Sequence, residues 1–301
     1  MPSEAGAAGN DDTSDFAQSG KLGLGGRAIV SKPQIGGASV SNVGGESSVE
    51  ATGGAASSES LAGAPTEAGA PAVVAGGGGK CPDLGGEKLV QADGFCIDES
   101  EVTFAHYQAF VDSHPSVASQ PAVCAGNTTF ANGCKATEPA KQPARCVDWC
   151  DARAYCQSVG KHLCGSTGSA SGALPYDAAV ISTDNQWYAA CSHAGERTYP
   201  YGDSYDTSAC WSADRPPVGN LIVKSASGCV GGYEGLWDMS GGLAEWIDSC
   251  NGEKGMADAC HIRGGSFSGS SAELRCDWES GAARDTSSNY IGFRCCADLT
   301  R

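Results

Sequence analysis

The chain has 301 residues, with 35 acidic against 19 basic side chains and a formal net charge of −16. Binding to nucleic acid or to an anionic membrane needs a basic surface, so this charge excludes both classes of partner. The longest uncharged stretches, such as residues 68–79, are rich in Gly, Ala and Pro and too weakly hydrophobic to cross a bilayer. We therefore expect no transmembrane segment in this chain.

The composition changes near Lys80. Residues 1–80 contain no Cys and one aromatic side chain, Phe16, among mostly small and polar residues. Such a segment cannot bury enough apolar surface to offset the conformational entropy lost on ordering, about 1 to 2 kcal/mol per residue. We expect a disordered tether rich in Gly, Ala and Ser over residues 1–80, and one folded domain over residues 81–301.

All 16 cysteines lie in the second part of the chain. An even number at this density is typical of a disulfide framework formed in an oxidising compartment. Zinc binding is the alternative, but close pairs such as Cys146 and Cys150 lack the spacing of zinc ribbons, and the chain has only five His. We expect a secreted or envelope-tethered protein. The start MPSEAGAAGNDD is not a signal peptide, so we expect the leader to be cleaved or to lie upstream.

Helical spacing of apolar residues predicts two helices in the first half of the domain. One spans residues 103–113, with Thr103 as N-cap, after an extended run over residues 95–102. The next spans residues 148–159, with Asp148 as N-cap and a glycine as its stop.

A third helix is predicted to begin at Thr183, where Thr183 and Gln186 would form a capping box, and to end before Gly195. Strand candidates follow at residues 261–267 and 290–296. Gly, Ser and Asp punctuate the rest, and no internal repeat occurs. These elements predict an irregular α+β domain.

Several sequence blocks in a fixed order carry a family resemblance. The C-terminal part reads GLWDMSGGLAEWIDSC from Gly235, IRGGSF from Ile262 and NYIGFRCC from Asn289. Upstream lie CIDESEVTFAHYQAFV from Cys96 and VDWCDARAYCQSVGKHLC from Val147. Together these blocks strongly resemble the formylglycine-generating enzyme family, also called the sulfatase-modifying factor family.

The resemblance covers about residues 95–298. It implies a single compact α+β domain with little regular secondary structure, distantly related in fold to C-type lectins, with structural calcium and disulfides. It also implies that Cys156 pairs with Cys295 and that Cys191 pairs with Cys276. A shared fold does not by itself imply shared chemistry.

Members of this family oxidise a cysteine of a sulfatase to formylglycine, using two active-site cysteines that hold copper(I). In the resemblance these two positions fall on Gly269 and Ser271, and neither residue can supply the thiolate that copper(I) prefers. We expect neither copper nor this mechanism. A related branch uses iron held by clustered His, whereas the five His here are scattered, so we do not expect iron. Another thiol, Cys260 or Cys296, remains an alternative oxidase centre.

The resemblance implies a calcium site in GLWDMSGGLAE. Its ligands would be the side chains of Asp238 and Glu245 and the carbonyl oxygens of Gly241 and Leu243. Calcium takes six to eight hard oxygen ligands, and a Gly-rich turn lets carbonyls point inward beside two carboxylates. The family's Asn at this turn is replaced by Gly242. Without the resemblance, Asp238 would simply cap a turn.

A second family calcium site would lie between Ser208 and Tyr233, with Asp214 as a candidate ligand. Arg294 is expected to form a structural ion pair. The sequence Asn127-Thr128-Thr129 is a glycosylation acceptor if the host glycosylates.

Further aromatic and charged residues allow two interpretations. Asp277, Trp278 and Glu279 would form either an exposed loop or the lining of a polar ligand cleft. Four other tryptophans are expected to pack in the core, namely Trp149, Trp187, Trp237 and Trp246.

The sequence thus predicts an exported, disulfide-stapled and calcium-stabilised domain of this family that binds a peptide or a glycan and lacks the oxidase mechanism. One alternative is a divergent oxidase or sulfatase activator. Another is a structural envelope protein with no small ligand. A free thiol would favour the oxidase, because the binding module needs none.

Overall fold

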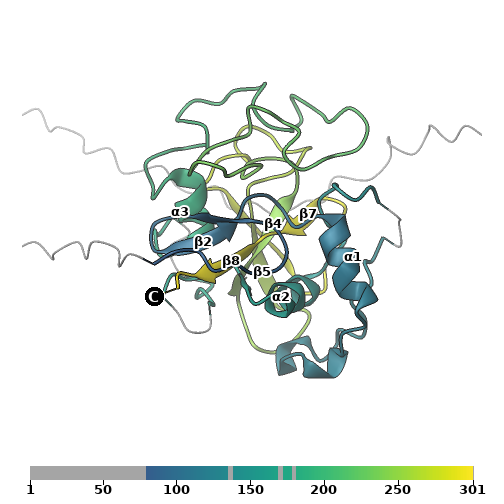
Figure 1. Ribbon diagram of the computed structural model, residues 1–301. Helices are drawn as coiled ribbons and strands as arrows, with labels where there is room; N and C mark the ends of the chain where they lie inside the picture. The colour runs from purple at the N-terminus through teal and green to yellow at the C-terminus, as the bar shows by residue number, and fades with distance from the viewer. Residues whose placement is uncertain (1–78, 135–137, 169–171, 178–180, 301) are drawn as a thin grey trace, which may run out of the picture. The chain divides into compact units, whose positions relative to one another are not determined.

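Two four-stranded sheets lie at the centre of the computed structural model (Figure 1), which describes residues 79–134, 138–168, 172–177 and 181–300. The strand order is β1-β2-β8-β3 in the first sheet and β6-β5-β4-β7 in the second. The tether predicted over residues 1–80 lies outside the described residues except for its last two. The described part therefore has the mixed helix and strand content that the sequence predicts.

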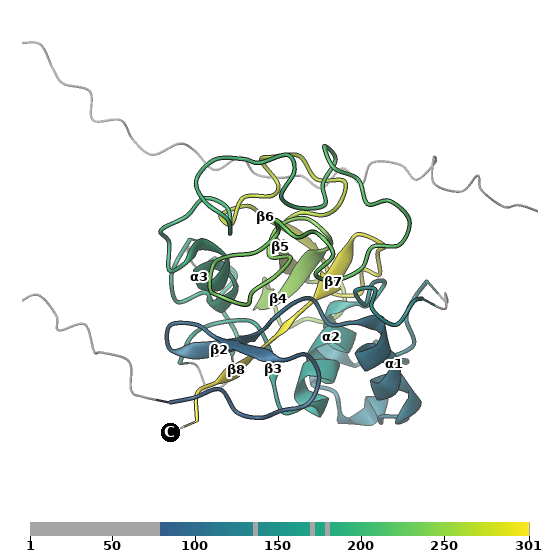
Figure 2. The same cartoon turned by 45° about the horizontal axis from the view of Figure 1, so that its top comes forward.

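The first sheet is antiparallel throughout and joins the two ends of the described chain. An isolated bridge between Lys80 and Thr300 extends this pairing, so the first and last described segments lie side by side (Figures 1 and 2). The extended run predicted over residues 95–102 forms a strand only as far as Asp98. The strands are β1 (Leu89–Gln91), β2 (Phe95–Asp98), β3 (His162–Leu163) and β8 (Cys295–Asp298).

In the second sheet β4 and β7 are parallel, whereas the pairs β4–β5 and β5–β6 are antiparallel. The strand predicted over residues 261–267 is β5, but it ends at Arg263 because Gly264 and Gly265 turn the chain with φ of 84° and 66°. The strands are β4 (Ala244–Cys250), β5 (Ala259–Arg263), β6 (Glu279–Ala283) and β7 (Ile291–Phe293).

The sequence predicts a single strand over residues 290–296, but in the structure this segment is divided into two strands at Arg294. The chain forms β7 in the second sheet, leaves it at Arg294, and continues as β8 in the first sheet. Arg294 is fully buried at this crossing. Its guanidinium donates hydrogen bonds to the carbonyl of Asp98 in the first sheet and to the carboxylate of Glu245 in the second, so it links the two sheets.

Two of the three predicted helices are confirmed. Helix α1 (Phe104–Asp112) is capped by Thr103, and α2 (Trp149–Ser158) is capped by the carboxylate of Asp148. These two helices pack against each other beside the second sheet (Figure 2). Two short 3-10 helices, η1 (Val117–Ser119) and η2 (Ala122–Cys124), lie between them in the sequence.

The predicted start of the third helix is wrong. Helix α3 spans Gln186–Ser192, and its N-cap is Asn185, whose side chain accepts a hydrogen bond from the backbone N–H of Tyr188 at 3.1 Å. Asn185 is fully buried, so tertiary packing selects it over Thr183 as the cap. None of the helices in the described ranges is long and apolar enough to cross a bilayer.

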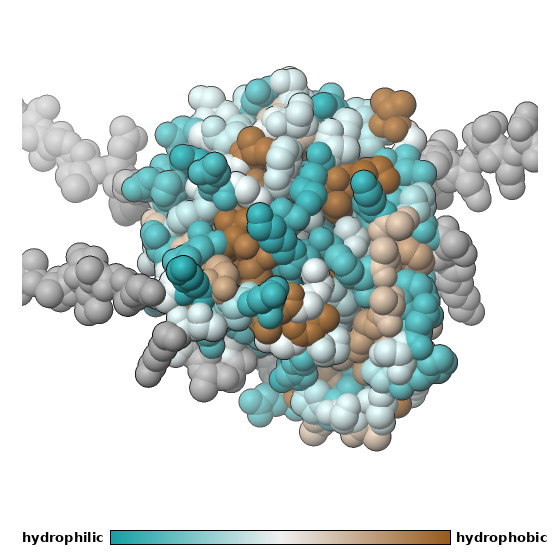
Figure 3. All heavy atoms as spheres, in the orientation of Figure 1, coloured by the Kyte–Doolittle hydropathy of each residue, from teal (hydrophilic) through white to brown (hydrophobic). Residues whose placement is uncertain are grey.

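The core is aromatic where α1, α2 and β7 meet. The rings of Tyr107, Tyr155 and Phe293 lie 5.5 to 6.1 Å apart between centroids. Trp149, Trp187 and Trp246 are buried as predicted, whereas Trp237 is only half-buried. The surface seen in Figure 3 is mainly polar with small separate apolar patches.

Eight disulfides use all sixteen cysteines, and no cysteine is free. They include both pairs that the family resemblance implies, and they join Cys260 to Cys250 and Cys296 to Cys164. The pairs are Cys81–Cys96, Cys124–Cys150, Cys134–Cys146, Cys156–Cys295, Cys164–Cys296, Cys191–Cys276, Cys210–Cys229 and Cys250–Cys260.

Candidate functional site

Arg294 forms a buried ion pair with Glu245 on β4. Its Nε donates to Oε2 of Glu245 and its Nη2 donates to Oε1, each at 2.7 Å. The indole Nε1 of Trp187 donates to the same Oε2 at 2.8 Å. The prediction that Arg294 is a structural ion-pair partner is thus confirmed. The ion pair links the crossing between β7 and β8 to strand β4, which carries Glu245.

Two further carboxyl groups lie beside this pair. Glu101 accepts a hydrogen bond from the backbone N–H of Leu243 at 3.2 Å, and Asp238 accepts one from that of Lys224 at 2.5 Å. Burial raises the pKa of Asp238 to about 6. Burial and the charges of Asp238 and Glu245 raise the pKa of Glu101 well above its ordinary value. Arg294 is therefore the cation that makes this buried cluster of carboxyl groups tolerable.

The residues predicted to hold calcium do not fit that ion as they are arranged. Both oxygens of Glu245 already accept hydrogen bonds, from Arg294 and Trp187. Within the described ranges, no three His, Cys, Asp or Glu side chains lie together in a way that could hold a metal ion. At Gly242 a Cβ atom would lie 2.8 Å from Oε1 of Glu101, so a side chain there, such as the family's Asn, would require the carboxyl group of Glu101 to shift.

The two predicted calcium sites also differ in burial. Asp238 is buried, whereas Asp214 lies on an exposed loop, where it accepts a hydrogen bond from the hydroxyl of Tyr205 at 2.9 Å. The contacts of Glu245 with Arg294 and Trp187 argue against calcium at the first site, whereas calcium binding at the second site stays a prediction.

Melting curves in calcium and in a calcium chelator test the first site. Calcium at 100 times its Kd would stabilise the fold by about 2.7 kcal/mol, which would raise Tm by roughly 5 to 10 °C. We expect a difference below about 1 °C, because the guanidinium of Arg294 occupies Glu245. A calcium-dependent rise of several degrees would instead support the calcium shell that the resemblance implies.

The loop between β5 and β6 carries the two positions of the family's catalytic thiols. The carbonyl of Gly269 accepts a hydrogen bond from the backbone N–H of Ala213 at 3.1 Å, and that of Ser271 accepts one from the hydroxyl of Tyr199 at 3.0 Å. Gly269 is buried and Ser271 is half-buried. The loop thus offers serine hydroxyls and backbone groups, but it offers copper(I) no soft ligand.

Aromatic side chains lie next to this loop. The ring of Tyr199 stacks on that of Tyr201 at 5.5 Å between centroids and contacts that of Tyr205 at 5.7 Å. The guanidinium of Arg215 lies 4.3 Å from the ring centroid of Trp211. Tyr201, Tyr205 and Trp211 are half-buried, so each residue is partly accessible to solvent. Sequence reasoning missed this group, although the three tyrosines within seven residues are a visible signal.

A Ser, a His and a Glu are aligned on three neighbouring strands. Oγ of Ser249 lies 3.1 Å from Nδ1 of His261, and Nε2 of His261 lies 3.4 Å from Oε2 of Glu279. Burial and the charge of Arg263 lower the pKa of His261 to about 4, so the ring is neutral at pH 7. The Ser249 residue is only 1% exposed, so no substrate can reach its hydroxyl, and the arrangement does not serve nucleophilic hydrolysis.

The segment predicted as either an exposed loop or a cleft lining is partly ordered in β6. Glu279 begins that strand and lies 3.8 Å from Nη1 of Arg263. Asp277 accepts two hydrogen bonds from Arg275, at 2.6 and 2.7 Å. Trp278 is half-buried against the aromatic core. The segment is therefore a polar border of the loop rather than an exposed loop.

Comparison with known proteins agrees with the sequence blocks. A family model described as "Sulfatase-modifying factor enzyme 1-like domain" matches residues 53–299. No curated protein matches the chain. The match begins before the domain boundary predicted at residue 81.

Among solved structures, PvdO from Pseudomonas aeruginosa is similar at 18% identity, over 68% of this chain and 80% of that chain, with a TM-score of 0.47. CarF is similar at 18% identity over 72% and 97% of the two chains, with a TM-score of 0.46. Treponema denticola variable protein 1 is similar at 17% identity over 71% and 92%, with a TM-score of 0.46. These likenesses concern the fold alone.

Proposed function

The chain belongs to the family of sulfatase-modifying factor enzyme 1-like domains, and we propose that it is an exported binding module for a peptide or a glycan. In this proposal it does not carry out the copper-thiol oxidation of the family's namesakes. The observation that carries the proposal is the use of all sixteen cysteines in eight disulfides. Copper(I) chemistry needs a thiolate pair, and a disulfide sulfur is not a thiolate.

The alternative oxidase centres are also in disulfides. Cys260 and Cys296 are both fully buried, and each is bonded to a second buried or half-buried cysteine. An oxidase built on either would first have to reduce a bridge inside the domain. The same eight bridges support export, because disulfides persist in oxidising compartments and are rare in the cytosol.

The binding role is supported by the surface around the loop between β5 and β6. Serine hydroxyls, backbone groups and the Arg275–Asp277 pair lie there beside half-buried aromatic rings. Partly exposed aromatic rings with polar neighbours suit sugars and the side chains of peptides, since tyrosine gives contact area at low entropic cost.

An oxidase assay distinguishes a binding module from a divergent oxidase. The full chain, incubated with copper and a cysteine-containing sulfatase peptide, should produce no formylglycine, whereas a family oxidase run in parallel should. Copper-dependent turnover by the chain would contradict the proposal.

Glycan and peptide arrays then test binding. We expect a ligand whose affinity falls at least about tenfold, or 1.4 kcal/mol, in Tyr205→Ala. Ile181→Ala changes an exposed side chain elsewhere and should leave the affinity unchanged. A chain that binds nothing on either array would favour the structural envelope protein.

A further inference from the structure

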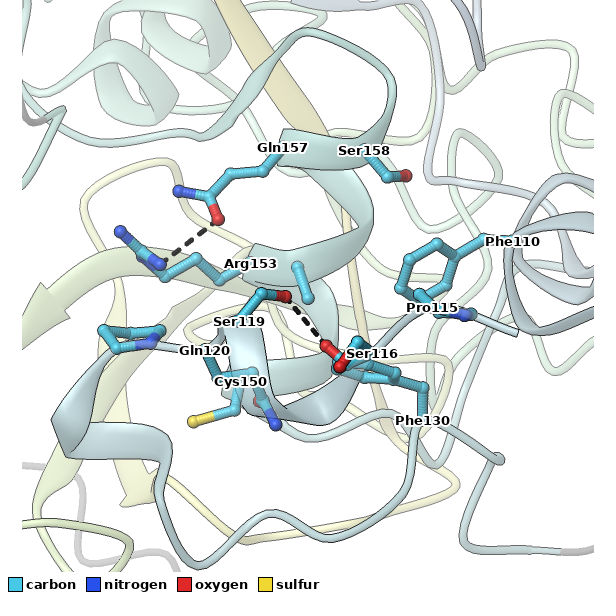
Figure 4. Close-up of a pocket in the computed structure, with 12 residues that line it drawn as sticks. Phe110, Pro115, Ser116, Ser119, Gln120, Phe130, Cys150, Arg153, Gln157 and Ser158 are labelled. Atoms are coloured by element: carbon cyan, nitrogen blue, oxygen red, sulfur yellow. Dashed lines mark hydrogen bonds between the residues drawn. The ribbon is translucent and has the colours of Figure 1, made fainter. Parts of the chain in front are cut away.

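A cavity of about 240 Å³ opens between α1, α2 and the two short helices η1 and η2 (Figure 4). One wall is apolar, because the rings of Phe110 and Phe130 pack at 5.2 Å between centroids beside Pro115 and Pro121. A buried cavity of about 150 Å³ accommodates benzene, so this one has room for a ring with a short side chain.

The walls of the cavity are fixed before any ligand binds. The disulfide between Cys124 and Cys150 joins η2 to α2. Gln120 donates to the carbonyl of Asn127 at 3.0 Å and accepts from its amide at 3.1 Å. Asn127 in turn donates to Asp151 on α2 at 2.6 Å. A preformed cavity binds with less loss of conformational entropy.

The same hydrogen bonds involve Asn127, the predicted glycosylation acceptor. Asn127 is buried, and its amide nitrogen already donates to Gln120 and Asp151. The side chain is therefore not available for glycosylation in the folded protein.

Arg153, which also lines the cavity, is a cation without a matching carboxylate. Arg153 on α2 is half-buried and donates from Nη1 to Oε1 of Gln157 at 3.3 Å (Figure 4). No carboxylate of the described residues lies within 4.0 Å of its guanidinium, and no Asp or Glu lines the cavity. Asp248 feels its charge from further away: burial raises the pKa of Asp248 to about 6, and Arg153 and Arg284 oppose that rise.

An arginine with no carboxylate partner within 4.0 Å is suited to bind an anion. Its planar fork of N–H donors matches the two oxygens of a carboxylate. The apolar wall of Phe110 and Phe130 suits an aromatic ring. A ligand pocket typically combines such an apolar lining with a few polar groups that fix orientation.

We propose that this cavity binds an aromatic carboxylate, with its ring against Phe110 and Phe130 and its carboxylate on Arg153. Two sources share this chemistry: a free aromatic acid and the C-terminal phenylalanine of a peptide. The proposal does not depend on the function proposed above, because it uses none of the residues around the loop between β5 and β6.

Titration with 3-phenylpropionate, followed by calorimetry or NMR, tests the proposal. Arg153→Gln keeps most of the side chain and removes the charge, so its affinity should fall at least about tenfold. Lys141→Gln removes the same charge from an exposed residue outside the cavity and should bind like the wild type. Equal binding by wild type and Arg153→Gln, or no binding by either, would overturn the proposal.

Analogues and a filled cavity test the two walls separately. The neutral amide 3-phenylpropanamide, which lacks the charge, and butyrate, which lacks the ring, should both bind more weakly than 3-phenylpropionate. Ala154→Phe should fill the cavity and abolish binding, and its melting curve shows whether the variant is folded. An amide that binds as tightly as the acid would contradict the role of Arg153.

A peptide arm identifies the source of the ligand. A short peptide that ends in a free C-terminal phenylalanine is compared with its C-terminal amide. Tight binding of the peptide with a free C-terminal carboxylate, together with weak binding of its amide, would assign the cavity to a peptide terminus. Binding of 3-phenylpropionate without binding of the peptide would assign it to a small acid.

Discussion

Replacing Arg294 with methionine should lower the free energy of unfolding by about 3 to 5 kcal/mol, because removing one partner of a buried ion pair leaves the other uncompensated. Both side chains are at most 1% exposed, and Glu101 and Asp238 lie beside them. The variant would therefore bury three carboxyl groups without their cation. Denaturant unfolding with the disulfides intact measures the loss.

Two comparisons separate this electrostatic effect from lost packing. In the partly exposed pair Arg275–Asp277, the side chains are 42% and 34% exposed, so Arg275→Met should cost at most about 1 kcal/mol. The loss in Arg294→Met should also be smaller at pH 4 than at pH 7. Protonation neutralises carboxyl groups whose folded-state pKa is raised, so the penalty appears only as the pH rises through that pKa. A loss that is equal at both pH values would contradict the ion-pair account.

Removing the Cys156–Cys295 and Cys164–Cys296 disulfides together should destabilise the chain more than the sum of the two single removals. The bridges close loops of 139 and 132 residues between almost the same points of the chain. When one of the two bridges is removed, the other still joins these two parts of the chain. The loop that is lost therefore has only about ten residues, and the free energy of unfolding falls by about 2.5 kcal/mol.

Removing both bridges frees the long connection as well. Because Cys191–Cys276 shortens that connection to about 50 residues, the second loss is about 4 kcal/mol and the total is about 6 to 7 kcal/mol. Alanine pairs and denaturant unfolding test this in a double-mutant cycle. The bridge Cys134–Cys146, with a separation of 12, is the control, and its removal should add to either single loss. Strict additivity of the two long bridges would contradict the argument.

The parts of the fold that the sequence predicts depend on local signals. Helices α1 and α2 have their caps, Thr103 and Asp148, and their apolar residues within one short segment. The start of α3 depends on Asn185, which is buried by residues far away in the sequence. The change of sheet at Arg294 is invisible in NYIGFRCC, because it is fixed by Glu245, which is 49 residues away in the chain.

The sites, too, depend partly on local sequence and partly on contacts between residues far apart in the chain. The order of the sequence blocks places Asp238 and Glu245 in one buried region, but only the structure shows that Arg294 fills it. The cavity between α1 and α2 could not be predicted, since its walls come together through the bridge Cys124–Cys150. Spacing alone does not assign a pairing among sixteen cysteines.

The most direct test of the central claim is the mass of the unreduced protein after alkylation in denaturant, followed by mapping of the disulfide-linked peptides. We predict no alkylated cysteine and eight bridges, with Cys250 joined to Cys260 and Cys164 joined to Cys296. A pair of alkylated cysteines that includes Cys260 or Cys296 would contradict the account and would favour an oxidase.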